Sequence, residues 1–569
     1  MDHTQKKREN RIIFLCAGIM LVLLALRLFM GYCMGVILNP DAVYDDRLLV
    51  QYSYLKSHFV DPNPYSLVKT LGFPLFLKVV ELSHLPYQMV LALVYFAASL
   101  VLFFFVKKTS GKILPAMLFF AWFLFYPAGF EDELAYHLYR NGLLVPMTAF
   151  VVGVGMHLMY DVIVLKKCGF KQFLESALLA LSGVFTIYIK EDGAWLLVSI
   201  LFFCAVIAVV FFIGLLRKKR EKSAIAWALI ICLLPGLCYG GVTAAYLKIN
   251  ERFFGVREIE TRTSGELGDF VANVYSIQSD ARSAVYWAPN DAIEKAFAAS
   301  PTLASYPELE EAIFDSKLIG GSGEAQIYGD FLTWVLRDAL VRTDLYSSEK
   351  EVSDLFAQVN RELTAAFEDG TLEKDTALFR PFASSGGKTW KEVGELIPRS
   401  FRCHLVSVAL LEYHPGGGKK PEYVNPLQDE FMLQTAARLH SPEIVQPEQS
   451  KKQAAVSRVI SVEFWVYRVL NVLLALAACF LFVRNIIRLI RKKQQRTADR
   501  IFRTAMFLVL FGIATLYSFC ICWFCSFLPK ADIVLRFYTP AVPGLLAVMY
   551  GLLAADLDFK GRLKKKTES

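Results

Sequence analysis

Charged residues are scarce in this chain of 569 residues. They make up 20% of it, whereas 55% of the chain is hydrophobic and the mean hydropathy is +0.41. In an ordinary soluble protein about a quarter of the residues are charged. The shortage of charge excludes a single soluble globular domain as the organisation of the whole chain.

Zinc signatures and internal repeats are also missing. No His and Cys spacing typical of a zinc site occurs, although Cys520, Cys522 and Cys525 lie close together. Small polarizable residues in a membrane helix explain this group better than a metal site does. Of 11 cysteines only Cys403 lies in the polar segment 247–460, which excludes a disulfide within that segment.

The apolar residues fall in long blocks. About 20 residues, at a rise of about 1.5 Å each, cross the hydrocarbon of a bilayer. The blocks predict a mainly α fold, a polytopic membrane bundle of about ten transmembrane helices. The predicted spans are 12–33, 86–106, 113–130, 142–165, 173–189, 193–216, 224–246, 461–483, 502–528 and 535–555. A further apolar stretch, 71–82, is too short to cross and predicts an interfacial helix.

Basic clusters lie at alternate ends of these spans. Because Lys and Arg near span ends stay cytoplasmic, they predict a multi-pass protein of the plasma membrane with both termini cytoplasmic. The clusters are 6–11, 107–108, 166–167, 217–220, 488–493 and 564–566. Arg27 lies inside the first apolar run and no Ala-x-Ala site follows it, so we expect an uncleaved first helix. The basic surplus is a topology signal, and no nucleic-acid partner is expected.

Three parts follow from this layout: a membrane domain at 1–246, a soluble segment at 247–460 and a membrane region at 461–569. The 247–460 segment holds 23 Lys and Arg against 32 Asp and Glu. Helical periodicity predicts a mostly helical extracytoplasmic domain, and this segment carries no recognisable catalytic motif. Its expected helices are 291–299, 306–314, 328–339 and 352–367, and its expected loops are 320–323 and 414–418.

Polar residues at the outer ends of spans are the candidate functional residues, because ionisable groups are costly there. The first group is Asp41, Asp45 and Asp46, directly after the first span. In a helix Asp41 and Asp45 would share a face, and close carboxylates suit general-base work or cation binding. The alternative is a solvated loop that only marks the outer side.

Four more groups lie at the same ends of other spans, each with a structural alternative such as a snorkelling anchor. A buried Arg or Lys there calls for an anion, and a lipid phosphate is a suitable one. These groups contain Lys69, Arg140, then Lys190 with Glu191 and Asp192, and finally Arg536 with Tyr538.

The order of these motifs resembles membrane glycosyltransferases of the GT-C superfamily, most nearly the protein O-mannosyltransferase and aminoarabinose-transferase branch. Asp45 and Asp46 match the paired acidic position of the first outer loop in that branch. The stretch 69–76 looks like its "KGPGYPLFL" element, with Thr and Leu in place of Gly-Pro. The stretch 190–193 looks like its "REDG" turn with Lys for Arg, and 536–540 looks like its "RYLLP" element.

The resemblance implies transfer of a sugar from a polyprenyl-phosphate donor at the extracytoplasmic face. Asp45 or Asp46 would be the base and Asp41 its orienting partner. Donor phosphate ligands would come from Lys69, Arg140, Lys190 and Arg536, with Glu191, Asp192 and Tyr538 as further site candidates. The acceptor could be a lipid, a cell-wall polymer or a protein, and a divalent cation stays open because branches of the superfamily differ in metal use.

Two other classes of function remain. A transporter or flippase would also interact with membrane lipids, but it predicts charges near the bilayer midplane and internal repeats. A scaffold or sensor would work through the 247–460 segment and would not need Asp45 or Asp46.

Overall fold

The computed structural model describes residues 3–38, 45–217, 224–316, 326–417, 429–446, 450–491, 497–528 and 535–556. Within these ranges the chain is helical and forms no strand, only isolated bridges. Nine of the described helical stretches are long and apolar enough to cross a membrane. They indicate a multi-pass membrane protein with a mainly α fold, as the sequence predicts.

The nine stretches coincide with the first nine predicted spans. Several are single helices, and others combine a helix with a short 3₁₀ or π turn at its end. In chain order they are α1 (His3–Met34), α5 (Tyr87–Ser110), α6 (Ile113–Leu124) with η1 (Pro127–Phe130), α7 (Arg140–Met159) with η3 (Tyr160–Val164), α8 (Phe170–Ile187), η4 (Glu191–Gly193) with α9 (Ala194–Leu216), α10 (Ile225–Phe254), α19 (Lys451–Arg491), and α20 (Ala498–Phe524) with η11 (Cys525–Phe527).

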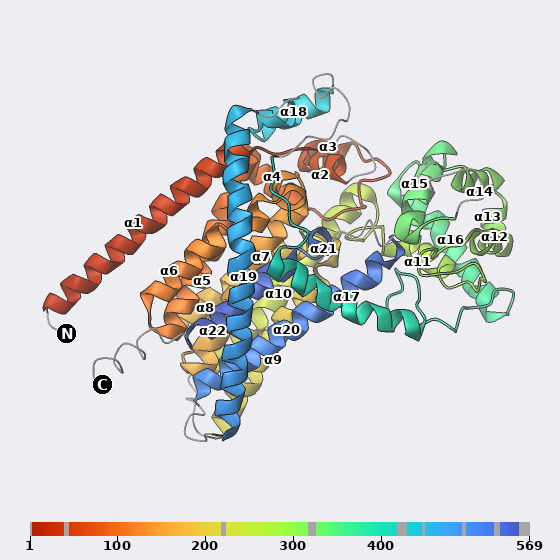
Figure 1. Ribbon diagram of the computed structural model, residues 1–569. Coiled ribbons are helices and arrows are strands. Elements are labelled where there is room, and N and C mark those ends of the chain that lie inside the picture. Colours follow the sequence, from red (N-terminus) through yellow and green to blue (C-terminus); the bar gives the residue numbers. More distant parts are fainter. Residues whose placement is uncertain are drawn as a thin grey trace.

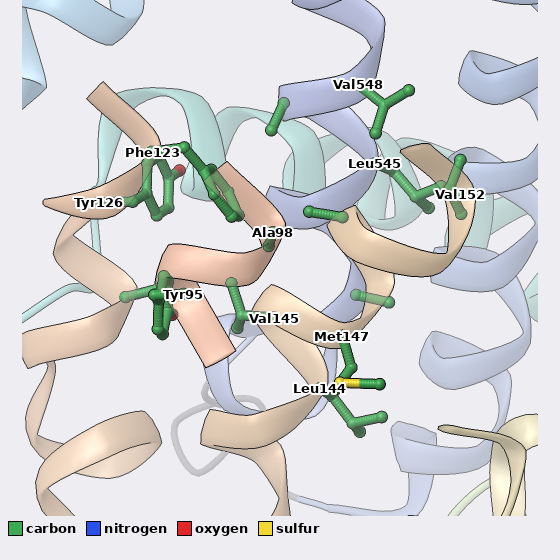
Figure 2. Close-up of a cluster of buried hydrophobic side chains, with 14 of the residues drawn as sticks. Tyr95, Ala98, Phe123, Tyr126, Leu144, Val145, Met147, Val152, Leu545 and Val548 are labelled. Carbon is green, nitrogen blue, oxygen red and sulfur yellow. The ribbon is translucent and has the colours of Figure 1, made fainter. Parts of the chain in front are cut away.

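The predicted tenth span is shorter than expected. The region 535–555 forms α21 (Leu535–Tyr538) and α22 (Ala541–Ala554), and the second helix has 14 residues. At about 1.5 Å per residue it is about 21 Å long, less than the hydrocarbon thickness of about 30 Å. Every residue of α22 is buried, because the helix packs against α5, α7 and α20 inside the bundle. Figure 2 shows Leu545 and Val548 of α22 among side chains of α5, α6 and α7.

Short helices cover one end of the bundle, namely α2 (Asp46–Ser53), α3 (Leu55–Val60), α4 (Gly72–Ser83) and the π turn η2 (Asp132–Tyr136). Helix α4 corresponds to the predicted interfacial helix. Its Phe73 and Leu77 are buried, whereas Leu75, Val79 and Leu82 are exposed. An apolar face left open beside a membrane bundle is typical of a helix that lies at the membrane surface.

The 247–460 segment divides between two cores. Residues 267–372, together with Phe527, form a separate hydrophobic cluster. The helices of this part are α11 (Gly265–Val274), α12 (Asn290–Ala299), α13 (Pro301–Ala304), α14 (Pro307–Phe314), η7 (Gly329–Phe331), α15 (Leu332–Arg342) and α16 (Glu349–Glu368). They gather at one side of the bundle (Figure 1). These helices confirm the periodicity read at 291–299, 306–314 and 352–367, and α15 begins four residues later than 328.

The rest of that segment packs into the membrane bundle. Its elements are α17 (Trp390–Ala409), α18 (Glu430–Arg438) and η9 (Pro442–Ile444). Leu396, Val406 and Met432 belong to the same core cluster as the spans. The described part of the predicted loop 414–418 is non-helical, and the predicted loop 320–323 lies outside the described residues. The 247–460 segment is therefore a helical domain followed by helices that extend the bundle.

Candidate functional site

Asp45 lies at the N-terminal end of α2, where an Asp commonly caps the free backbone N–H groups. Here its side chain makes no such cap and turns instead toward two cations. An Asp45 oxygen lies 2.6 Å from Lys69 Nζ and 3.7 Å from Arg140 Nη2, and the Tyr139 hydroxyl donates to it over 3.0 Å. The Asp45 side chain is 21% exposed, so this carboxylate is within reach of a ligand.

Lys69 is the most deeply buried cation of this group, with 1% of its side chain exposed. The stretch of turns and bends that carries it is fixed by hydrogen bonds to three other regions. The Val68 N–H donates to the Tyr52 hydroxyl over 3.1 Å, and the Leu71 N–H donates to the Tyr246 hydroxyl over 3.2 Å. The Gly72 N–H donates to the Tyr188 carbonyl over 2.7 Å. This stretch therefore joins α2, α10 and the end of α8.

Arg140 and Glu191 complete the group. Arg140 is 3% exposed and its Nη1 donates to a Glu191 oxygen over 2.6 Å. The same Glu191 oxygen accepts from the Thr70 N–H over 3.3 Å. We call Asp45, Lys69, Arg140 and Glu191 the ion cluster. Its members come from four segments of the chain that meet at one end of the bundle.

The neighbours of Glu191 point elsewhere. Lys190 has an extended backbone, with φ −148° and ψ 147°, so consecutive side chains alternate in direction. Lys190 Nζ pairs with Asp192 over 2.9 Å. Of the three charged residues predicted together, Glu191 therefore belongs to the ion cluster, while Lys190 and Asp192 form a local ion pair.

Asp46 is fully buried and binds His137 Nε2. The His137 ring stacks on the Tyr139 ring, with centroids 5.5 Å apart, and Phe537 stacks on Tyr139 at the same distance. This stack brings the residue after Arg536 close to the ion cluster. Asp46 therefore helps to position Tyr139 through His137, and Tyr139 in turn donates a hydrogen bond to Asp45. Asp45 is the partly exposed member of the acidic pair.

Arg536 pairs with the buried Glu131 and, over 3.3 Å, with Asp132. Asn141, next to Arg140, donates to the Phe537 carbonyl over 2.9 Å. Arg536 thus belongs to a second ion group that is joined to the ion cluster through Phe537. Tyr538 contacts the Phe537 ring at 5.3 Å.

Burial and nearby charges shift the pKa of several of these groups. Burial opposes the ionised form of Asp45, but Lys69 and Arg140 outweigh it and lower the pKa of this carboxyl. Burial lowers the pKa of Lys69 to about 8, against the opposing effect of Asp45. Burial and the neighbouring Asp132 raise the pKa of Glu131 well above its ordinary value. The ion cluster therefore holds an ionised carboxylate beside a lysine whose pKa is lowered to about 8.

Sequence reasoning identified every member of the ion cluster and missed three residues around it. His137, which binds Asp46, is the first. The others come from the 247–460 segment: Trp334, whose ring lies 5.2 Å from Lys69 Nζ, and Arg262, whose charge acts on Asp45. A single Trp or Arg within a polar segment forms no motif, so one sequence alone does not indicate that it lies near a site. Of the predicted site, Asp41 lies outside the described residues.

We examined the described residues for a metal site and for a cavity that could hold a ligand. Across the described ranges no group of three His, Cys, Asp or Glu side chains could hold a metal ion. A cavity of about 450 Å³ lies between α1, α6 and α19, and no member of the ion cluster lines it. Its wall is apolar apart from the Glu463 and Tyr467 side chains and the Trp122 indole.

Comparison with protein families, with characterised proteins and with solved structures finds no match to this chain.

Proposed function

We propose that this protein is a membrane glycosyltransferase that moves a sugar from a polyprenyl-phosphate donor to an acceptor at the extracytoplasmic face. One observation carries the proposal. A partly exposed carboxylate, Asp45, lies between two buried cations, Lys69 and Arg140, at one end of a membrane bundle. A carboxylate with adjacent cations meets the two needs of sugar transfer from a phosphate, a proton acceptor and a stabilised leaving group.

In the proposed reaction the acceptor hydroxyl oxygen attacks the anomeric carbon of the donor sugar. The bond between that carbon and the phosphate oxygen breaks, and the polyprenyl phosphate leaves with the electron pair. Asp45 takes the hydroxyl proton, while Lys69 and Arg140 stabilise the charge of the leaving phosphate. The lowered pKa of Asp45 keeps this carboxylate ionised and ready to accept a hydrogen bond from the hydroxyl.

Lys190 and Arg536 have a different role in this proposal. Each is already bound to carboxylates of its own, Lys190 to Asp192 and Arg536 to Glu131. Lys69 and Arg140, by contrast, flank the proposed base itself, because they lie 2.6 and 3.7 Å from the same Asp45 oxygen. We therefore place the donor phosphate at Lys69 and Arg140 and assign Lys190 and Arg536 to positioning the surrounding turns.

The proposed orientation follows from the basic loops, which we expect on the cytoplasmic side. It places the ion cluster and residues 265–372 outside the cell. Both termini are cytoplasmic if the region 535–556, with the short α22, completes the last crossing.

The test is sugar transfer by the full chain in proteoliposomes, with radiolabelled polyprenyl-phosphate hexoses and aminopentoses as donors and envelope extract as acceptor. Asp45→Asn keeps the shape and removes the base, so we expect transfer to fall by about 10²–10⁴-fold. The control is Asp61→Asn, an exposed Asp in the neighbouring loop. Equal transfer by Asp45→Asn and the parent protein would refute the base assignment. Movement of intact donor across the bilayer, with no bond broken, would favour a flippase instead.

A further inference from the structure

Helix α17 belongs to the 247–460 segment, yet one of its faces is bound to the membrane bundle. The Cys403 sulfur lies 3.7 Å from the Cys522 sulfur of α20. His404 Nε2 lies 3.0 Å from the Thr515 hydroxyl of the same span. Figure 1 shows α17 beside α20, between the bundle and the helices of residues 265–368. This face fixes the position of α17 against a membrane span.

A second face of α17 is apolar and uncovered. Ile397, Phe401 and Leu405 follow each other at four-residue spacing, so they form one stripe along the helix. Their exposed fractions are 49%, 43% and 61%. Leu411, just after the helix, extends this stripe with 58% exposure.

A third face of α17 is charged. Lys391, Glu395 and Arg402 are exposed there, about a quarter of a turn away from the apolar stripe. Arg402 reaches Glu412 over 3.5 Å. A helix with a protein-bound face, an apolar face and a charged face fits the boundary between lipid and water, where the apolar face is buried and the charged face is hydrated.

The apolar stripe adjoins a surface that lipid must cover. Phe401 lies 6.3 Å from Phe511, centroid to centroid, and Phe511 belongs to the predicted span of α20. Along α20, Leu508 and Leu516 on either side of Phe511 are 50% and 64% exposed. Exposed apolar side chains along a helix that crosses the membrane face the acyl chains of the lipid. The stripe on α17 continues this lipid-covered surface, and that continuity identifies what covers it.

We propose that α17 is an interfacial helix whose stripe of Ile397, Phe401 and Leu405 lies in the acyl chains of the leaflet on the side of the ion cluster. The occupant of the stripe is membrane lipid, and the charged face lies at the headgroups. The helix thereby holds residues 265–368 at the membrane surface. This inference does not depend on the proposed sugar transfer.

The experiment uses the full chain in nanodiscs that contain radiolabelled phosphatidylcholine. A photoreactive diazirine amino acid replaces Leu405, and in separate proteins Leu516 and Val341. Leu516 is the lipid-exposed control in α20, and Val341 is a 45% exposed control on α15, whose neighbours belong to the separate core of residues 267–372. After illumination we expect lipid adducts at position 405 to equal those at 516 and to exceed those at 341 about tenfold.

Adducts at 516 with position 405 at the level of 341 would overturn the proposal. A protein–protein adduct at 405 in place of the lipid adduct would also overturn it, because a second polypeptide would then cover the stripe. A second measurement repeats the comparison at Ile397, on the same stripe one turn from Phe401 and two turns from Leu405. We expect lipid adducts at position 397 to be as abundant as those at position 405.

Discussion

Lys69 is a buried amine beside a partly exposed carboxylate. Its side chain is 1% exposed, and burial lowers its pKa to about 8 from the ordinary value of 10.5. Asp45, 2.6 Å away, is 21% exposed and keeps a lowered pKa because Lys69 and Arg140 outweigh the effect of burial. The pair therefore joins a partly exposed anion to a cation that loses its charge as the pH rises through about 8.

We expect transfer to decline as the pH rises through about 8, because neutral Lys69 no longer stabilises the leaving phosphate. The same shift affects stability. Lys69 loses its proton at a lower pH in the folded chain than in the unfolded chain, so the folded state gains stability between about 8 and 10.5 while activity is lost. The measurement is the pH profile of kcat/KM.

Lys69→Arg should move the alkaline decline to higher pH, since a guanidinium stays protonated throughout this range. Lys78→Arg, on the more exposed Lys78 of α4, is the matched control and should leave the profile unchanged. An alkaline decline that stays near 8 in Lys69→Arg would show that another group titrates.

At the scale of elements, the ion cluster depends on a close approach between two short connections. The Gly72 N–H donates to the Tyr188 carbonyl, which ties the start of α4 to the end of α8. A Cβ on Gly72 would lie 2.2 Å from that carbonyl oxygen and 2.5 Å from the Ile189 nitrogen. Lys69 and Glu191 lie on the two segments joined in this way, so their distance is set by backbone contact.

Gly72→Ala should therefore separate these segments, because neither backbone can rotate away from the new methyl group. We expect the free energy of unfolding to fall by about 1–3 kcal/mol and transfer to be lost. Thermal unfolding in detergent and the transfer assay measure the two effects. The control is Gly240→Ala in α10, where an added Cβ meets nothing within 4 Å. Equal behaviour of the two variants would contradict the close-approach argument.

Across the whole molecule, the helical domain of residues 265–368 is fastened to the loop that carries Lys69. Arg337 of α15 is 1% exposed, pairs with Glu349 over 3.0 Å and donates to the Pro64 carbonyl. The Thr261 N–H donates to the Leu67 carbonyl over 2.7 Å. The domain and the membrane bundle therefore share one hydrogen-bonded junction beside the ion cluster.

Arg337→Met leaves Glu349 buried without its cation, and we expect it to cost about 3–5 kcal/mol of folding free energy. Arg342→Met on the same helix removes an ion pair with exposed Asp315 and should cost less than about 1 kcal/mol. Thermal unfolding with a thiol-reactive dye, which reports the buried cysteines, compares the two. A larger loss for Arg342→Met would contradict the junction described here.

The orientation of the molecule is testable with an impermeant thiol reagent on whole cells. Ala304→Cys, on the helical domain, should label from outside above the background of the parent chain. Lys167→Cys, in a basic loop at the other end of the spans, should label only after lysis. Both positions are exposed. The reverse pattern would overturn the proposed topology and place the ion cluster in the cytoplasm.

The sequence by itself determined the nine described helices that are long and apolar enough to cross a membrane, because the length of such a helix follows from bilayer thickness. It also picked out Asp45, Lys69, Arg140 and Glu191, since ionisable residues at the outer ends of spans are costly. It predicted one membrane span at 535–555, where the structure has the short helices α21 and α22. Helix α22 is apolar on all sides because protein surrounds it, and composition cannot distinguish a protein environment from a lipid environment.

Only the tertiary structure decided which charges meet. The sequence treats Lys190 and Glu191 alike, but extended backbone turns one toward Asp192 and the other toward Arg140. It also treats Asp45 and Asp46 alike. In the structure Asp46 is buried and binds His137, whereas Asp45 is partly exposed and pairs with Lys69. Pairing between distant segments depends on side-chain direction and packing, which are properties of the folded chain and are absent from the order of residues.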